Sequence, residues 1–176
     1  MLWDMPLEKA HKRVQSKMIR YVAFIFGLGA TFFLLTSFNR SSFARNGQGI
    51  ARFLMMLGYS KANASGIAGN LFVESSYNPK AIGDNGTSFG LAQWHKSRWN
   101  RLNEWTESNN LNPNSFQSQL RYLDWELNNT EKRAKTKLLE AKTPYDSAYA
   151  FAKYYERPQK ISETRMTKAI EIYNSI

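Results

Sequence analysis

One acidic side chain in an unusual setting gives the first indication of chemistry. Residues 70–95 have the sequence NLFVESSYNPKAIGDNGTSFGLAQWH, in which Glu74 follows an apolar segment and precedes a loop rich in glycine, hydroxyl and amide groups. At about 100° per residue, a helix ending here places Glu74 on the same face as Ile67 and Leu71. We therefore expect a partly buried carboxyl group at the C-terminal end of a helix.

A carboxyl group in that position is a candidate general acid. Burial and the negative end of the helix dipole both disfavour the charged form, so the group could keep its proton near neutral pH. Cleavage of a glycosidic bond needs such a proton, because the leaving oxygen must be protonated as the bond breaks. The alternative is a glutamate at a fraying helix end that turns into solvent.

The loop after Glu74 has the side chains of a sugar-binding surface. Its glycines allow the backbone to approach a ligand closely, and its polar and aromatic groups suit the hydroxyls and flat faces of a sugar. The predicted substrate contacts are Thr87, Ser88, Gln93, Trp94 and His95. The alternatives are a surface hairpin whose glycines only permit the turn and, for His95, a purely structural hydrogen bond.

The composition limits what else the chain can be. Its 176 residues, 43% hydrophobic and 14% aromatic, are enough for one domain plus an extra element, but not for a second full domain. With no cysteine and only two histidines, neither a thiol nucleophile nor a zinc centre is expected, and we predict no metal ion and no cofactor. The net charge of +10 comes without a nucleic-acid-binding motif, so we expect attraction to a polyanionic envelope or lipid surface and no nucleic-acid partner.

An uncharged segment near the N-terminus is long enough to cross a bilayer. Residues 21–38, YVAFIFGLGATFFLLTSF, follow five basic residues and are followed closely by three, so residues 1–20 should stay in the cytoplasm or the virion interior. We predict a transmembrane helix that contacts the lipid bilayer over 21–38, a linker over 39–46 and an extracytoplasmic catalytic domain over 47–176. A cleaved signal peptide and a buried core helix are the alternatives.

The domain beyond the linker should be mainly α. Apolar residues recur at helical spacing, and capping signals include Asn114 with Gln117 and Thr143 before Pro144. Only residues 86–94 look extended, which predicts a short β-hairpin. The expected helices cover residues 50–57, 60–73, 95–108, 116–127, a stretch beginning at 143, and 162–173.

Two ordered motifs resemble the phage tail lysozyme family. The stretch ESSYNPKAIGDNGTSFGLAQWHKSRW, residues 74–99, has a glutamate, a serine, a nearby proline and a G-L-x-Q element, as in that family and in the wider superfamily of lysozymes and lytic transglycosylases. The stretch FAKYYERP, residues 151–158, is similar to the family's late aromatic-E-R-P signature. The resemblance extends over about residues 48–173.

The resemblance implies a lysozyme-like, two-lobed helical fold and cleavage between N-acetylmuramic acid and N-acetylglucosamine. Glu74 matches the catalytic glutamate, and Gln93 matches the groove-facing amide of the G-L-x-Q element. Asp84 could be a second catalytic carboxylate that holds a water or stabilises an oxocarbenium-like centre, or only a turn residue of Asp-Asn-Gly. Of Tyr154 and Tyr155, one should pack in the core and the other line the groove, and we assign Tyr155 to the substrate.

Other acidic residues are expected to have structural or no roles. We interpret Glu156 and Arg157 as an internal ion pair that holds the two lobes together. Asp124 and Glu126 flank Trp125 on a predicted helix, and we expect both to lie on its solvated surface.

The combined prediction is a membrane-anchored enzyme that degrades peptidoglycan, either a muramidase or a lytic transglycosylase. It would be encoded by a phage for genome delivery or lysis, in the host inner membrane or a virion membrane. One alternative is a catalytically inactive protein of the same fold that binds glycan or builds the virion. Another is a membrane-disrupting protein that acts through residues 21–38.

The charge asymmetry around residues 21–38 predicts the topology of the chain. A reporter that works only in the periplasm should be active when fused after Ile176, because the basic segment keeps residues 1–20 in the cytoplasm. Reporter activity is measured in intact bacteria, with a cytoplasmic reporter at the same residue as the control. An active cytoplasmic reporter with a silent periplasmic one would contradict the predicted topology.

Overall fold

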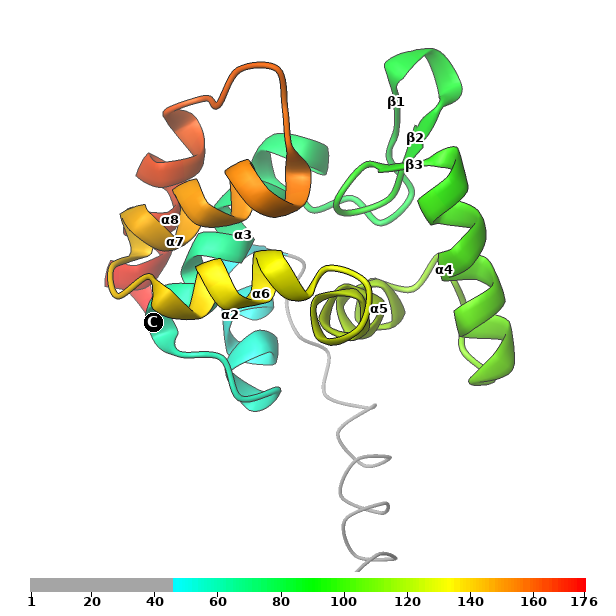
Figure 1. Cartoon of the computed structure of the whole chain (residues 1–176), viewed down its shortest axis with the longest axis horizontal. Helices are drawn as coiled ribbons and strands as arrows, with labels where there is room; N and C mark the ends of the chain where they lie inside the picture. Colours follow the sequence, from blue (N-terminus) through cyan, green and yellow to red (C-terminus); the bar gives the residue numbers. More distant parts are fainter. Residues whose placement is uncertain (1–45) are drawn as a thin grey trace, which may run out of the picture. The chain divides into compact units, whose positions relative to one another are not determined.

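Helices make up most of residues 46–176, the part of the chain that the computed structural model describes (Figure 1). The α-helices are α2 (Gly47–Met56), α3 (Lys61–Ser75), α4 (Lys96–Ser108), α5 (Phe116–Asn128), α6 (Lys132–Glu140), α7 (Pro144–Phe151) and α8 (Thr164–Ser175). Three short strands form one sheet, and two short helical turns are η2 (Asp84–Gly86) and η3 (Ala152–Glu156). The predicted fold class, mainly α with a small β element, is confirmed for this part of the chain.

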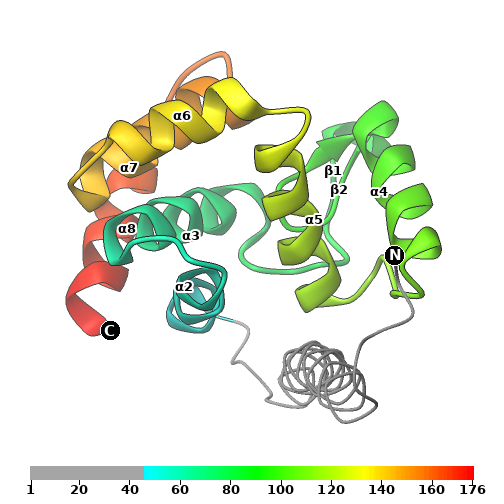
Figure 2. The same ribbon diagram turned by 60° about the horizontal axis from the view of Figure 1, so that its bottom comes forward.

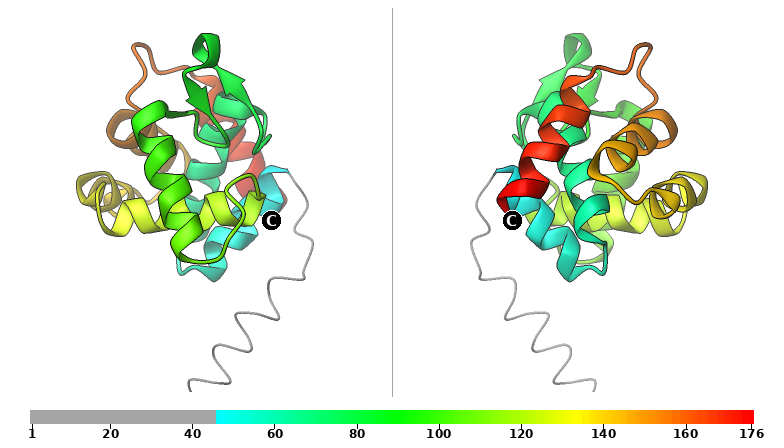
Figure 3. Two further views of the ribbon diagram at one scale, coloured as in Figure 1. Left: turned by 90° about the vertical axis from the view of Figure 1, so that its right-hand side faces the viewer. Right: turned by 90° about the vertical axis from the view of Figure 1, so that its left-hand side faces the viewer.

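Helix α3 is the central element of the larger helical group. It packs against α2, α7 and α8, and the views in Figures 2 and 3 show these helices gathered around it. Ile67 and Leu71 are completely buried, as their predicted face requires. Gly69 allows α8 to come close, since a Cβ added there would lie 2.4 Å from the carbonyl oxygen of Arg165. The close approach at Gly69 therefore lets the first turns of α8 lie against the middle of α3.

Most of the predicted helices are present, and their ends follow the expected capping chemistry. Ser60 caps α3 by accepting a hydrogen bond from the backbone N–H of Asn63, and Thr143 caps α7 by accepting one from that of Asp146. The predicted capping box of α5 is wrong by one residue, because Ser115 rather than Asn114 is the N-cap. Prediction also missed α6, since only Ala134 and Leu138 of that helix are buried and two residues make a weak apolar pattern.

The predicted β-hairpin is a three-stranded antiparallel sheet. Strands β1 (Ile82–Gly83), β2 (Ser88–Phe89) and β3 (Trp94–His95) pair in sequence order, with Gly83 opposite Ser88 and Ser88 opposite His95. The turn η2 between β1 and β2 has left-handed φ angles at Asp84, Asn85 and Gly86, which these residue types tolerate better than most. The sheet and α4 lie on one side of α5, away from α3 and α8 (Figures 1 and 2).

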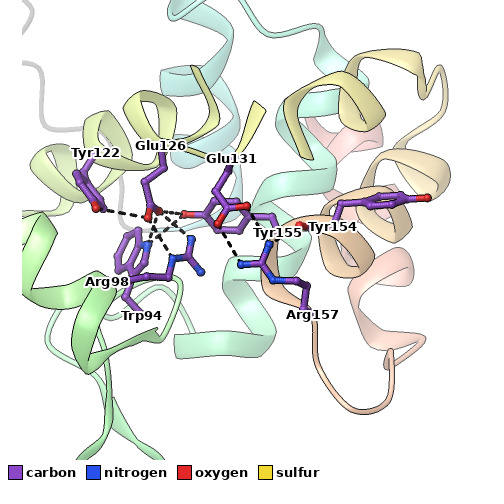
Figure 4. A network of polar contacts seen from close by, with 8 residues as sticks. All are labelled: Trp94, Arg98, Tyr122, Glu126, Glu131, Tyr154, Tyr155 and Arg157. Atoms are coloured by element: carbon purple, nitrogen blue, oxygen red, sulfur yellow. Dashed lines mark hydrogen bonds and ion pairs between the residues drawn. The ribbon is translucent and has the colours of Figure 1, made fainter. Parts of the chain in front are cut away.

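A buried carboxylate joins the sheet, α4, α5 and η3 (Figure 4). The Oε2 atom of Glu126 accepts hydrogen bonds from the indole N–H of Trp94 at 2.8 Å and from the hydroxyl of Tyr155 at 2.6 Å. Arg98 donates to both oxygens, from Nε at 3.1 Å and from Nη2 at 2.8 Å. Glu126 is only 1% exposed, so the predicted solvated position is wrong for this residue. A longer contact from the Tyr122 hydroxyl to Oε1, at 3.4 Å, is the fifth hydrogen bond, and together these donors offset the cost of burying the charge.

The predicted membrane anchor cannot be compared with this structure. Within residues 46–176, every helix is too short or too polar to cross a bilayer. The predicted basic segment 1–20, the transmembrane helix 21–38 and nearly all of the linker 39–46 lie outside the described residues. They therefore stay predictions from sequence.

Replacing Glu126 with Gln should destabilise the domain strongly. Gln keeps one acceptor but presents an NH₂ group to buried donors and leaves the charge of Arg98 without a partner, which costs about 3 kcal/mol. Urea denaturation of a protein of residues 46–176, followed by circular dichroism, measures the free energy of unfolding. The control is Glu104→Gln on the exposed face of α4, which should have almost no effect. Equal stabilities of the two variants would contradict the structural role of Glu126.

Candidate active site

A cleft of about 690 Å³ brings the two sequence motifs together. Its volume is within the range of small-ligand sites in proteins. Its walls come from α3, the sheet and its turn, α4, η3 and the segment that leads into α8. The lining residues are Glu74, Asp84, Gln93, His95, Arg98, Glu156, Arg157, Pro158, Gln159, Lys160 and Arg165.

Glu74 lies in the last turn of α3 and faces this cleft, as predicted. Its side chain is 17% exposed, and its Oε1 atom is 2.6 Å from Nη1 of Arg165. The same Nη1 donates to the side-chain oxygen of Asn70 at 3.0 Å, which fixes the guanidinium against α3. Sequence analysis missed Arg165 because it lies far along the chain in α8 and has no local signal. A guanidinium at this distance holds the carboxyl group of Glu74 in one orientation at the cleft.

Asp84 also lines the cleft, from the turn η2, and the neighbouring hydroxyls hold it in place. Its Oδ2 atom accepts a hydrogen bond from the Ser88 hydroxyl at 2.5 Å, and its backbone carbonyl accepts one from the Thr87 hydroxyl at 2.8 Å. The Ser88 hydroxyl also lies 3.2 Å from Nδ1 of His95. Ser88 is completely buried, and neither Thr87 nor Ser88 lines the cleft. The predicted contact of Ser88 is therefore corrected to a role in shaping the turn that carries Asp84, whereas Thr87 is exposed on the same turn and its contact with substrate stays a prediction.

Gln93 and His95 line the cleft, and their predicted contact with substrate stays a prediction, whereas Trp94 between them does not line it. The side-chain nitrogen of Gln93 donates to the carbonyl of Gly90 at 3.0 Å, which holds the amide at the cleft wall. Trp94 is 0% exposed and packs edge-on against Tyr122 with ring centroids 5.9 Å apart. The predicted contact between Trp94 and substrate is wrong, because its indole belongs to the core.

The late motif also needs two corrections. Tyr155 is 0% exposed and stacks on Phe151 at a centroid distance of 4.4 Å, so it does not contact a ligand in the cleft. Burial raises the pKa of its hydroxyl well above 10.0, with the charge of Glu126 as a further cause, and this keeps the hydroxyl a hydrogen-bond donor. Tyr155 thus anchors the motif instead of binding substrate.

The predicted ion pair between Glu156 and Arg157 is replaced by a different one. Arg157 has a left-handed φ of 56° at the end of η3, and its guanidinium contacts both oxygens of Glu131, at 2.9 and 3.0 Å (Figure 4). Glu156 instead lines the cleft, where its Oε1 atom is buried without a hydrogen-bond partner within the described part of the chain. The arginine of the late motif therefore forms an ion pair with Glu131. The glutamate of the same motif lines the candidate site.

The electrostatic setting of Glu156 differs from that of an ordinary glutamate. Burial raises the pKa of its carboxyl group well above the ordinary value of 4.5, and the negative charge of Glu74 raises it further. The positive charges of Arg98 and Arg165 act in the opposite direction without reversing the shift. The cleft thus contains a carboxylate paired with arginine and a second carboxyl group that retains its proton more strongly.

The family of the chain follows from comparison of its sequence with known families. The model of the phage tail lysozyme family matches residues 45–176, which include the whole described domain. The chain belongs to the phage tail lysozyme family. It is also similar to Morphogenesis protein 1 of Bacillus phage B103, with 30% identity over 125 residues. That match covers 64% of this chain and 34% of the relative, so the chain spans about a third of the relative's length.

Membership of the phage tail lysozyme family gives the cleft its chemical context. At the level of the family, the chain is a lysozyme-like phage protein. The cleft has groups that such chemistry uses: more than one carboxyl group in its lining, together with an amide and an imidazole. Glycoside hydrolysis by carboxyl groups requires no metal ion as a further reactant.

The raised pKa of Glu156 predicts a specific dependence of stability on pH. The folded protein holds this proton to higher pH than the unfolded chain, so the contribution is fully present below about pH 4.5 and is lost as the pH rises through the raised pKa. As the pH rises from about 4.5 to neutrality, the free energy of unfolding should therefore fall less for Glu156→Gln than for the parent protein. Urea denaturation at a series of pH values measures this difference.

The control for this comparison is again Glu104→Gln, the same substitution on an exposed surface. It should follow the pH dependence of the parent. If Glu156→Gln also runs parallel to the parent at every pH, then Glu156 does not hold its proton in the folded state.

Proposed function

We propose that this chain cleaves the glycosidic bond between N-acetylmuramic acid and N-acetylglucosamine in peptidoglycan, with Glu74 as the general acid. The observation that carries the proposal is that one cleft is lined by both family motifs, with Glu74 and Asp84 among its lining residues. Glu74 and Gln93 match the catalytic and groove-facing positions implied by the family resemblance. The geometry of the side chains makes a concrete mechanism possible.

In this mechanism Glu74 gives its proton to the leaving oxygen as the glycosidic bond breaks. The contact with Arg165 uses Oε1 of Glu74, which leaves Oε2 to approach the substrate. Arg165 thereby fixes the orientation of the acid, and it stabilises the carboxylate that remains after proton transfer. The acid must be reprotonated before the next cycle.

Asp84 is proposed to act on the charge or the water on the other side of the scissile bond. The hydrogen bond from Ser88 holds its Oδ2 atom in place, so the carboxylate is positioned by the protein before substrate arrives. A hydrolase would use Asp84 to position water or stabilise the oxocarbenium-like centre. A lytic transglycosylase would use a hydroxyl group of the substrate as the nucleophile, and Asp84 would matter less.

We further propose that residues 21–38 anchor the enzyme in a bilayer and that the catalytic domain acts on the extracytoplasmic side. The uncharged length of this segment and the basic residues before it support the anchor. The function would be genome delivery or host lysis for a phage, from the host inner membrane or a virion membrane. No nucleic-acid partner is proposed.

A second candidate is a catalytically inactive virion protein of the same fold. The name of the Bacillus phage relative, which refers to morphogenesis, favours this alternative. The presence of Glu74 and Asp84 in a cleft with Gln93 and His95 favours the enzyme. Measurement of activity separates the two candidates.

Replacing Glu74 with Gln should lower the rate of peptidoglycan cleavage by about 10²–10⁴-fold, since general acid catalysis contributes about that factor. Gln keeps the shape and an acceptor for Arg165, but it has no acidic proton. The measurement is clearing of purified cell walls, with circular dichroism to confirm the fold and Glu104→Gln as the charge-matched control. Clearing at the parent rate by the Glu74 variant would remove this residue from the proposed role.

Mass spectrometry of the products of the parent protein identifies the reaction. Reducing ends indicate hydrolysis, and anhydro-muramic ends indicate transglycosylation. A well-folded parent protein that yields neither product from any peptidoglycan would favour the structural virion protein.

A further inference from the structure

We propose that Glu74 and Glu156 share one acidic proton across the cleft, with Glu156 holding it in the resting protein and returning it to Glu74 for catalysis. This inference rests on the proposed function of Glu74 as the general acid. In this account Glu156 is a positioning residue for the proton, because it acts through Glu74 and not on the substrate.

The first support is the surroundings of the Glu156 side chain. It lines the same cleft as Glu74, and its Oε1 atom is buried without a hydrogen-bond partner in residues 46–176. Its two sequence neighbours are engaged elsewhere, Tyr155 with Glu126 and Arg157 with Glu131 (Figure 4). A buried carboxylate without donors is costly, whereas a neutral carboxyl group is tolerated much better. The position therefore favours the protonated form of Glu156.

The second support is the balance of charge around this position. Glu156 is influenced by Glu74 from α3, Arg98 from α4, Glu126 from α5 and Arg165 from α8. With Glu156 itself, two guanidinium groups face three carboxyl groups. Each guanidinium is committed to another acid, Arg98 to Glu126 and Arg165 to Glu74. The third carboxyl group has no cation of its own, so one proton balances the cluster. The other charged or titratable side chains that line the cleft are Asp84, His95, Arg157 and Lys160.

These surroundings also agree with the titration expected for Glu156. Burial raises the pKa of its carboxyl group well above the ordinary value, and the charge of Glu74 is the next cause. The proton affinity of Glu156 therefore depends on the charge of Glu74. Arg165 contacts Oε1 of Glu74 at 2.6 Å, whereas Oε1 of Glu156 is buried without a hydrogen-bond partner in the described domain.

The transfer can be written as two balanced steps. In the first, the O–H bond of Glu156 breaks and an O–H bond forms on Glu74, so one negative charge moves from Glu74 to Glu156. In the second, the O–H bond of Glu74 breaks as the glycosidic oxygen receives the proton, and solvent later restores the proton of the pair. Arg165 can compensate the newly charged Glu156, because its Nε–H group is buried without a hydrogen-bond partner in the described domain.

The pH dependence of peptidoglycan cleavage by the full chain tests this proposal. Glu156→Gln removes the stored proton and the charge that helps Glu74 to bind one. At neutral pH its kcat/KM should fall about 10- to 100-fold, as part of the contribution of general acid catalysis is lost. The basic limb of its profile should move to lower pH, so that acidification restores activity towards that of the parent.

The control, Glu104→Gln, should keep both the rate and the pH limbs of the parent. A merely structural role for Glu156 would lower activity by the same factor at every pH and leave the limbs in place. Either that result or a profile identical to the parent would overturn the proposal.

Carbon-13 NMR of glutamate side-chain carboxyls in the full chain provides a readout that does not depend on activity. One resonance, absent from Glu156→Gln, should titrate at higher pH than the other glutamates. In Glu74→Gln it should move to lower pH, because the neighbouring negative charge is gone. If every glutamate titrates in the ordinary range, or if Glu74→Gln leaves the Glu156 titration unchanged, the shared proton is refuted.

The two experiments together separate this inference from the proposed function. An active parent with uncoupled titrations refutes the shared proton and leaves Glu74 as the acid. Coupled titrations in a parent that never cleaves peptidoglycan refute the enzymatic function and the use of the proton in turnover. The NMR of the parent and of Glu74→Gln needs no Glu156 variant to fold.

Discussion

The arrangement of the cleft depends on the buried carboxylate of Glu126. It binds Trp94 of the first motif and Tyr155 of the late motif, so one acceptor fixes two segments about 60 residues apart in sequence. The neighbours of these two aromatic residues line the cleft: Gln93 and His95 beside Trp94, and Glu156 and Arg157 beside Tyr155. Burying a charged group is costly, and the donors of Trp94, Tyr155 and Arg98 offset that cost only while they stay in place. The hydrogen bonds of Glu126 thus hold together two of the segments that line the cleft.

Charge pairing assigns different states to the carboxyl groups at this site. Arg98 and Arg165 each hold one carboxylate, at 2.8 and 2.6 Å, whereas Glu156 has a buried oxygen without a donor. A site in which neighbouring acids differ in proton affinity can store a proton and still present a charged group to substrate. The contact of Glu74 with Arg165 orients the proposed acid and places a positive charge beside it. In the proton-sharing scheme proposed above, the nearby carboxyl group of Glu156 holds the proton at rest.

The match to the phage tail lysozyme family covers residues 45–176 and does not include the segment before them. The uncharged run at 21–38 is a property of sequence alone, and its proposed role as an anchor rests on length and flanking charge. The Bacillus phage relative is matched over about a third of its length. About two thirds of the relative lies outside the match, so the biological context of this domain stays a proposal.

The sequence alone determined the helical class, most helix positions and the place of Glu74, because helical periodicity and capping are local properties of the chain. It failed for α6, where only two residues are buried, and for the exact cap of α5. The tertiary structure decided which polar and aromatic groups reach the cleft. Glu126 and Trp94 are buried by partners in other elements, and Arg165 meets Glu74 from α8, contacts that local spacing does not encode. Side chains next to each other in sequence, such as Trp94 and His95, point to opposite sides of a strand, and only packing decided which side became the core.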